Sequence, residues 1–154
     1  YEIGVRLVGS EMCIRDSGMN LGGRYVFPFG SVKFVPALHS SGYEIDGVMT
    51  YMGEASGIIL EAEDKKIYHA GDTALFSDMR LFAKDKSIDV AFLPIGDNYT
   101  MGPEDALEAV SYLNPEITIP IHYNTFPVIQ QNPAIFVEQV VGGKVLNPGE
   151  TILV

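Results

Sequence analysis

Apolar and polar positions alternate in short runs from residue 18 onward, and the runs predict strands and helices in turn. Two pairs of runs flank short polar or Gly-containing segments, Gly30-Ser31 and Glu63-Asp64-Lys65, which is typical of β-hairpins. Two later runs are almost wholly apolar, which favours buried strands. The predicted strands are residues 24–29, 32–37, 57–62, 66–69, 88–94 and 117–121.

The clearest helical pattern covers residues 101–113. Pro103 suits the first helical turn, and the acidic residues that follow it suit the positive end of a helix. Ala106, Ala109 and Leu113 recur at helical spacing and predict one buried face. Shorter helices are predicted at residues 76–83 and 133–140.

Two further segments complete the prediction. Residues 40–53 are polar and contain glycine, so we expect a loop there. Residues 144–146 and 151–154 surround Asn147-Pro148-Gly149 and predict a terminal hairpin. A β-meander followed by alternating helices and strands predicts an α/β fold, with one mixed sheet and helices on one face.

Residues 1–17 differ from the rest of the chain, because their apolar positions follow neither a strand nor a helix period. Residues 8–17 resemble a translated sequencing adapter, so we expect residues 1–17 to be a non-native leader. A genuine N-terminal extension is the alternative. The fold prediction therefore covers one domain, residues 18–154.

Composition narrows the classes of function. The 154 residues are 47% hydrophobic and 19% charged, which is typical of a globular domain. A net charge of −10 argues against nucleic acid as a partner, and no apolar run reaches the roughly 18 residues of a membrane span. The single cysteine, Cys13, excludes an internal disulfide and a Cys-rich zinc site. A metal ion would need nitrogen and oxygen ligands.

Three segments place a candidate ligand just after an apolar, strand-like run. They are Pro36-Ala37-Leu38-His39-Ser40, His69-Ala70-Gly71-Asp72-Thr73, and Ile119-Pro120-Ile121-His122-Tyr123. A sheet delivers such side chains to a shared edge, and imidazole with carboxylate is a ligand set for a zinc-type ion.

Each candidate has a structural alternative. His39 could be a surface residue, Asp72 a helix N-cap, and His122 a buried structural histidine. Thr73 could hydrogen-bond the Asp72 carboxylate or cap the following helix. His69 is expected to pack or to hydrogen-bond rather than to bind metal, because strand alternation separates it from Asp72.

Two polar turns lie beside the candidate ligands. Asp97, Asn98 and Tyr99 follow the strand at residues 88–94, where they could orient a substrate or form a solvated turn. Tyr123 and Asn124 could donate hydrogen bonds to a developing oxyanion. Motifs for a serine nucleophile, a dinucleotide or a phosphate loop are missing from the sequence.

The order His39, Gly71-Asp72-Thr73, His122 resembles the last three metal-ligand motifs of the metallo-β-lactamase superfamily. The chain is similar to the bacterial "metal-dependent hydrolase" family of uncharacterised proteins. The resemblance implies the C-terminal half of an αβ/βα sandwich, and two zinc ions in the complete protein. It also implies that His39 binds one ion, that Asp72 bridges both, and that His122 binds the other.

The superfamily's first motif, His-x-His-x-Asp-His, is not found in this sequence. The resemblance implies a water held between the metals that attacks an ester, lactone, amide or phosphodiester. We expect this chain alone to be inactive or to bind metal weakly, since two protein ligands per ion are fewer than a catalytic zinc site has.

The same reading predicts a small-molecule substrate, no nucleic-acid or membrane partner and a cytoplasmic location, and it allows a homo-oligomer. A missing half would leave apolar side chains of one sheet face incompletely buried. The residues expected there are Ile58, Leu60, Val90, Phe92, Ile117 and Ile119. The competing hypotheses are a non-catalytic, acidic interaction domain and a nuclease of the same superfamily, which the charge disfavours.

Overall fold

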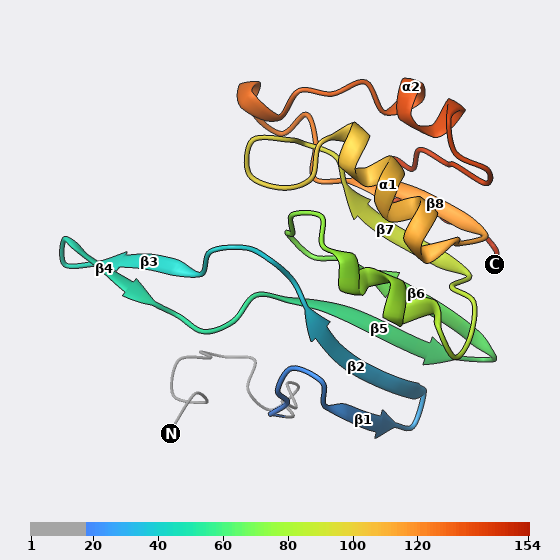
Figure 1. Ribbon diagram of the computed structural model, residues 1–154, viewed down its shortest axis with the longest axis horizontal. Helices are drawn as coiled ribbons and strands as arrows, with labels where there is room; N and C mark the ends of the chain where they lie inside the picture. The colour runs from blue at the N-terminus through green and yellow to red at the C-terminus, as the bar shows by residue number, and fades with distance from the viewer. Residues whose placement is uncertain (1–17) are drawn as a thin grey trace.

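The computed structural model describes residues 18–154, so the predicted leader lies outside the described residues. A six-stranded sheet forms the centre, in the order β1-β2-β5-β6-β7-β8 (Figure 1). Its strands are β1 (Arg24–Phe27), β2 (Gly30–Pro36), β5 (Ser56–Ala62), β6 (Lys65–His69), β7 (Val90–Pro94) and β8 (Ile117–Ile121). The mixed sheet confirms the predicted α/β fold class.

The directions of the strands decide where the site lies. β1, β2, β5 and β6 pair antiparallel in succession, whereas β6, β7 and β8 pair parallel. Two antiparallel steps separate β2 from β6, so β2 points the same way as β6, β7 and β8. The carboxyl ends of these four strands therefore meet at one edge of the sheet.

Local residues set where the helices begin and end. α1 (Pro103–Leu113) starts with proline in its first turn and ends at Asn114, whose backbone is left-handed. Before α2 (Pro133–Glu138), the Asn132 side chain accepts a hydrogen bond from the Ala134 N–H. The predicted helix at residues 76–83 is a 3₁₀ helix, η2 (Ser77–Ala83), and a short 3₁₀ turn, η3 (Pro127–Ile129), follows β8.

One face of the sheet carries the hydrophobic core. Register places Ile59, Tyr68 and Ala91 side by side on this face. They pack with Met79 of η2 and with buried residues of α1 and α2, which cover this face (Figure 1). The predicted placement of helices on one face is thus confirmed.

The opposite face is less covered. Ile58 is 39% exposed, and Leu60, Phe92 and Ile117 are partly exposed, as expected. The expectation was wrong for Val90 and Ile119, which are buried. The C-terminal segment shelters this part of the sheet, because the Lys144 N–H donates to the Thr118 carbonyl and residues 146–148 share a hollow with β7 and β8.

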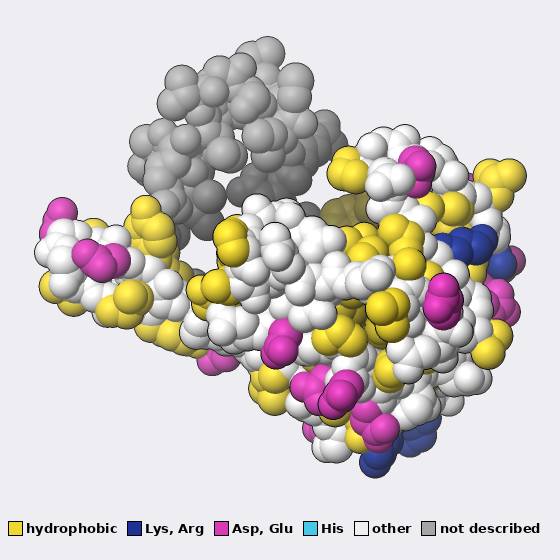
Figure 2. Space-filling view, turned by 90° about the horizontal axis from the view of Figure 1, so that it is seen from above, with side chains coloured by type: hydrophobic (Ala, Val, Ile, Leu, Met, Phe, Trp, Pro, Cys, Tyr) yellow, Lys and Arg dark blue, Asp and Glu magenta, His cyan; other side chains and the backbone are white. Residues whose placement is uncertain are grey.

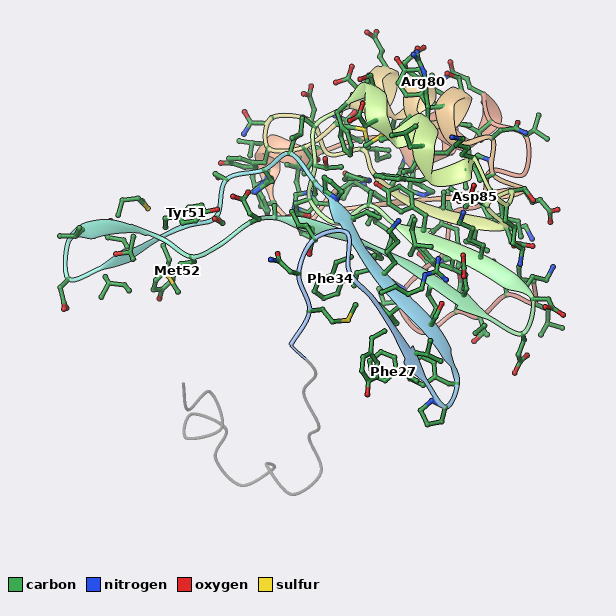
Figure 3. All side chains as sticks on the ribbon, turned by 60° about the horizontal axis from the view of Figure 1, so that its bottom comes forward. Phe27, Phe34, Tyr51, Met52, Arg80 and Asp85 are labelled. Atoms are coloured by element: carbon green, nitrogen blue, oxygen red, sulfur yellow. The ribbon has the colours of Figure 1, made fainter. Side chains whose placement is uncertain are left out.

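The predicted loop at residues 40–53 was wrong. It contains a second, two-stranded sheet, β3 (Gly42–Ile45) with β4 (Val48–Tyr51), which projects as an arm (Figures 1 and 3). Asp46 and Gly47 both have positive φ, at 51° and 78°, which gives the tight turn that suits a two-residue hairpin. The Asp-Gly pair was the signal in the sequence that the loop prediction missed.

This arm carries exposed apolar side chains, and Figure 2 shows them on its surface. They include Tyr43, Val48, Met49 and Tyr51. An isolated hairpin of two strands is marginally stable in water, and the exposure of these side chains shows that the arm has no core of its own.

The predicted terminal hairpin was also wrong, since residues 144–154 contain no strand. Gly143 forms only an isolated bridge with Thr118, and Asn147 instead closes a local turn with Glu150. Within residues 18–154, no helix is long and apolar enough to cross a membrane.

Candidate metal centre

Four loops follow the strands whose carboxyl ends meet at one edge. His39 lies three residues after β2, Asp72 three after β6, Asp97 three after β7, and His122 directly after β8. The candidate ligands thus come from segments far apart in the sequence but share one edge of the sheet. This arrangement is what the strand-end pattern predicted.

Thr73 ties two of these loops together. Its hydroxyl oxygen accepts a hydrogen bond from the Leu38 N–H at 3.0 Å, and its hydroxyl donates to the Ala74 carbonyl at 2.8 Å. The Ala74 N–H returns a bond to the Leu38 carbonyl at 3.0 Å. Thr73 is fully buried and serves neither of its two predicted roles, because its hydroxyl is used between loops.

Asp72 and His122 approach each other at this edge. The Asp72 Oδ2 lies 3.6 Å from the His122 Nε2, and the two side chains are 47% and 27% exposed. Two ligands of one tetrahedral zinc ion, each about 2.0–2.2 Å from it, lie roughly 3.3–3.6 Å apart. The observed separation therefore fits two donors that share an ion.

A close approach between two loops holds His122. Its backbone is left-handed, with φ of 54°, and Gly96 from the loop after β7 lies against it. A Cβ on Gly96 would lie 2.3 Å from the His122 carbonyl oxygen and 3.3 Å from its Nδ1. Glycine is thus required at residue 96, a role that the sequence analysis missed because only the fold brings the two loops together.

The second ring nitrogen of His122 points inward. Its Nδ1 is buried and has no hydrogen-bond partner among the described residues. The Nε2 is consequently the atom that faces Asp72 and the open edge. The His122 side chain is therefore partly rather than fully buried.

Gly71 gives Asp72 its position. The Gly71 backbone has φ of 66°, and a Cβ there would lie 2.6 Å from the Ser56 carbonyl oxygen. Only glycine allows this turn against β5. The chain then leaves the strand, and the Asp72 carboxylate reaches the edge, as the sequence predicted.

His39 is exposed at the same edge. Its Nδ1 lies 2.7 Å from the Ser40 carbonyl oxygen, an arrangement in which Nδ1–H donates and Nε2 keeps a free lone pair. Among residues 18–154, however, no three His, Cys, Asp or Glu side chains lie close enough to share an ion. The structure brings Asp72 and His122 together, and the participation of His39 stays a prediction.

His69 ends β6 on the face opposite the core. Its ring stacks on Phe92 at 5.6 Å, and its Nδ1 accepts a hydrogen bond from the Gly71 N–H at 3.1 Å. Burial lowers the pKa of His69, and the nearby Asp72 carboxylate opposes this shift. These contacts hold the Gly71 turn, while its role near a substrate stays a prediction.

The loop after β7 forms a tight, exposed turn. Asp97 and Asn98 have positive φ, the Asp97 carboxylate accepts from the Asn98 N–H at 2.7 Å, and the Asp97 N–H donates to the Met101 carbonyl at 3.0 Å. The Tyr99 ring lies 6.0 Å from the ring of Phe126 in the loop after β8. These residues border the edge, as both of their predicted roles require.

The loop after β8 uses part of its polar groups internally. The Asn124 side-chain oxygen accepts a hydrogen bond from the Gln131 N–H at 2.8 Å, so this oxygen fixes the loop. Tyr123 is partly buried against the core, and burial raises the pKa of its hydroxyl. The proposed hydrogen-bonding roles of both residues toward a substrate stay predictions.

Comparison with known proteins places the chain in a family of metal-dependent hydrolases. The family model of the β-lactamase superfamily domain matches residues 10–123, so the chain belongs to the metallo-β-lactamase class of α/β proteins. It is 91% identical to the UPF0173 metal-dependent hydrolase of Enterococcus faecalis over 150 residues, and 54% identical to that of Bacillus cereus over 138 residues. The chain is therefore a member of the UPF0173 metal-dependent hydrolase family.

The coverage of these relatives is partial. The matches take up 97% and 87% of this chain, but 67% and 61% of the two relatives. Among solved structures, Igni18, a metallo hydrolase from Ignicoccus hospitalis, superimposes with a TM-score of 0.76 at 38% identity, over 88% of this chain and 59% of that one. The family and the fold are thus shown for about two thirds of a family member's length.

Proposed function

We propose that this chain supplies part of the metal centre of a small-molecule hydrolase. The observation that carries the proposal is the 3.6 Å approach of the Asp72 carboxylate and the His122 imidazole at the shared edge. A carboxylate and a neutral imidazole form a donor set that suits a divalent ion, most of all zinc. Asp72 would bridge two ions in the complete protein, His122 would bind one, and His39 would bind the other.

A bound divalent ion would acidify a water and polarise the scissile group of an ester, lactone, amide or phosphodiester. The chain's own residues hold the donors in place. Thr73 fixes the loop of Asp72 against the loop of His39, and Gly96 allows the loop after β7 to pack closely against His122. The amide group of Asn124, whose oxygen is already used, would be free to donate to a developing negative charge.

The donor set of this chain is incomplete by itself. Two protein ligands for each ion are fewer than the three that catalytic zinc sites have. The remaining donors would come from a His-x-His-x-Asp-His segment outside this sequence, so the chain alone would be inactive. We further propose a cytoplasmic location for the complete enzyme.

The alternative function is an acidic interaction domain with relic metal motifs. The apolar arm at residues 42–51 and the net charge of −10 are the observations that favour it. A docking domain does not require Asp72 and His122 to converge, and that convergence is why we place the hydrolase first.

Zinc titration of the chain tests the proposal. Because Cys13 is a potential zinc ligand, every variant would carry Cys13→Ser. We expect zinc to bind with a micromolar or weaker dissociation constant, and Asp72→Asn with His122→Gln to weaken it more than about tenfold. Calorimetry and metal analysis after dialysis would measure this.

The matched control is Asp78→Asn, since Asp78 is an exposed carboxylate of η2 that we assign to no metal. Its zinc affinity should equal that of the parent chain. Equal affinity in all variants would contradict the assignment of Asp72 and His122. A dissociation constant far below micromolar in the parent chain would contradict the incomplete donor set.

A further inference from the structure

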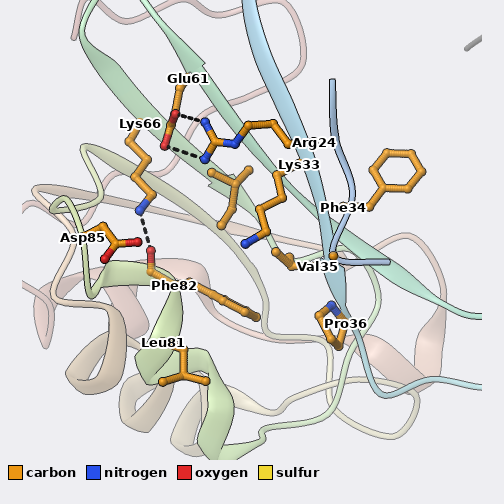
Figure 4. Close-up of a pocket in the computed structure, with 12 residues that line it drawn as sticks. Arg24, Lys33, Phe34, Val35, Pro36, Glu61, Lys66, Leu81, Phe82 and Asp85 are labelled. Atoms are coloured by element: carbon orange, nitrogen blue, oxygen red, sulfur yellow. Dashed lines mark hydrogen bonds and ion pairs between the residues drawn. The ribbon is translucent and has the colours of Figure 1, made fainter. Parts of the chain in front are cut away.

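A cavity of about 230 Å³ lies away from the metal edge, between the core face of the sheet and η2 (Figure 4). Residues of β2, β5 and β6 form one wall, and the end of η2 with the following turn forms the other. It is smaller than the roughly 300–1,000 Å³ of sites for drug-sized ligands. A ligand here would have only a few non-hydrogen atoms.

One part of the cavity is apolar. Val35 and Ile59 line it from the sheet, and Leu81 and Phe82 line it from η2. Leu81 is 60% exposed, so an apolar group that entered the cavity would bury surface that water now contacts. This wall suits a short hydrocarbon chain.

The other part carries an excess of positive charge. Arg24, Lys33 and Lys66 line it together with two carboxylates, Glu61 and Asp85. Glu61 is already paired with the Arg24 guanidinium, and Figure 4 draws this pair. The local net charge of +1 contrasts with −10 for the whole chain.

Lys66 is the central cation of this wall. It is 5% exposed, and its ammonium donates to the Phe82 carbonyl at 2.6 Å and to the Lys86 carbonyl at 3.1 Å. An ammonium has three N–H donors, and residues 18–154 provide no third acceptor and no carboxylate within 4.0 Å. Burial lowers the pKa of Lys66, and the charges of Glu61 and Asp85 oppose this.

Lys33 supplies a second cation from β2. Its side chain is partly buried, makes no ion pair among the described residues, and reaches into the cavity in Figure 4. Two ammonium groups with unused donors thus face the same small, half-apolar space. A carboxylate satisfies such donors with charge-assisted hydrogen bonds.

We propose that this cavity binds a small monocarboxylate with a short apolar chain, in contact with Lys33 and Lys66. The site is separate from the metal centre, because Lys66 lies near the start of β6 and Asp72 lies beyond its end. Hydrolysis of an ester, lactone or amide releases a carboxylate, so a ligand of this class matches a product of the proposed reaction.

An NMR titration with sodium pentanoate tests the proposal on the whole chain, with EDTA present to exclude metal effects. We expect saturable shifts confined to amides of β2, β6 and η2. 1-Pentanol, which has the same chain but no carboxylate, should bind at least about fivefold more weakly. Equal binding of the alcohol, or no saturable shifts with pentanoate, would overturn the proposal.

Charge variants give the decisive contrast. Lys33→Gln should weaken pentanoate binding about fivefold, whereas Lys144→Gln removes the same charge away from the cavity and should leave it unchanged. Asp85→Asn removes a competing carboxylate and should strengthen binding, a gain that misfolding cannot produce. Equal effects of Lys33→Gln and Lys144→Gln, or no gain from Asp85→Asn, would contradict a site built on charge.

The proposed carboxylate site can be tested independently of the proposed metal centre. Asp72→Asn with His122→Gln should leave pentanoate binding unchanged, since neither residue lines the cavity. A loss of pentanoate binding in this double variant would contradict a separate site, whatever the zinc titration shows.

Discussion

The two ends of strand β6 differ in the charge of the groups they present. At the carboxyl end, a carboxylate and an imidazole lie 3.6 Å apart and stay partly exposed. At the other end, the Lys66 ammonium is buried and donates to two carbonyl oxygens. One end therefore suits a cation, and the other suits an anion.

This contrast shows how one strand serves two purposes. At the carboxyl end, left-handed residues and glycines fix the loops that carry Asp72 and His122. At the other end, the Lys66 ammonium donates to the carbonyl oxygens of Phe82 and Lys86, and the bond to Phe82 ties η2 to the sheet. The same ammonium thus has a structural role and, with its third N–H, a donor for the carboxylate that we propose.

The largest expected effect is the loss of activity when a proposed ligand at the carboxyl end of β6 is replaced in the complete protein. Asp72→Asn should lower kcat/KM at least about a hundredfold, because loss of a ligand costs more than the 10- to 100-fold that loss of a ligand's hydrogen-bond partner costs. Steady-state kinetics on a panel of esters, lactones and phosphodiesters would measure it. Activity that persists unchanged would remove Asp72 from the metal centre.

Gly96→Ala tests whether close packing positions His122. The new Cβ would lie within 2.3 Å of the His122 carbonyl oxygen, so we expect about 1–3 kcal/mol less stability and weaker zinc binding. Urea denaturation and zinc titration would measure the two effects. Gly18→Ala is the control, since nothing lies within 4 Å of its Cβ; equal stability of both variants would refute the packing argument.

Lys66→Met tests the structural role of the opposite end. Removal of the ammonium leaves the carbonyl oxygens of Phe82 and Lys86 without this donor, so the free energy of unfolding should fall by about 1–3 kcal/mol. Urea denaturation measures it, and the exposed Lys84→Met serves as the control. If Lys66→Met were more stable, the free-energy cost of burying the ammonium would exceed the stabilisation that its hydrogen bonds provide.

A smaller, pH-dependent effect should come from Asp89, beside Lys66. Burial raises the pKa of Asp89, but a hydrogen bond from the Lys66 N–H and the Lys65 ammonium together lower it below its ordinary value. A carboxyl whose pKa is lowered in the folded state stabilises the fold above its unfolded pKa of about 3.9. That contribution is lost as the pH falls through the lower folded value.

Asp89→Asn should therefore cost about 1 kcal/mol at neutral pH and flatten the dependence of stability on pH below about 4. Denaturation at a series of pH values measures both. The exposed Asp78→Asn is the control, and an unchanged acid dependence in Asp89→Asn would show that other carboxyls cause it.

The sequence predicted the regular elements where local signals agree. Proline in the first turn and buried alanines at helical spacing mark α1, and a polar turn between apolar runs marks β5 and β6. It missed the arm, although Asp46-Gly47 is a hairpin signal, because the prediction gave the glycines and polar residues of 40–53 more weight than the short apolar runs beside that pair. It was wrong about residues 144–154, where pairing of Lys144 with Thr118 replaced a local hairpin.

The amino-acid sequence by itself determined the residues that end each strand and the chemistry they carry, because turns and periodicity are local. Only the tertiary structure decided that β2, β6, β7 and β8 point one way and that Asp72 meets His122, since strand order and register are non-local. It also decided that Gly96 supports His122 and that Lys66 holds η2. Such contacts join segments that no local pattern relates, so the packing of the whole sheet defines them.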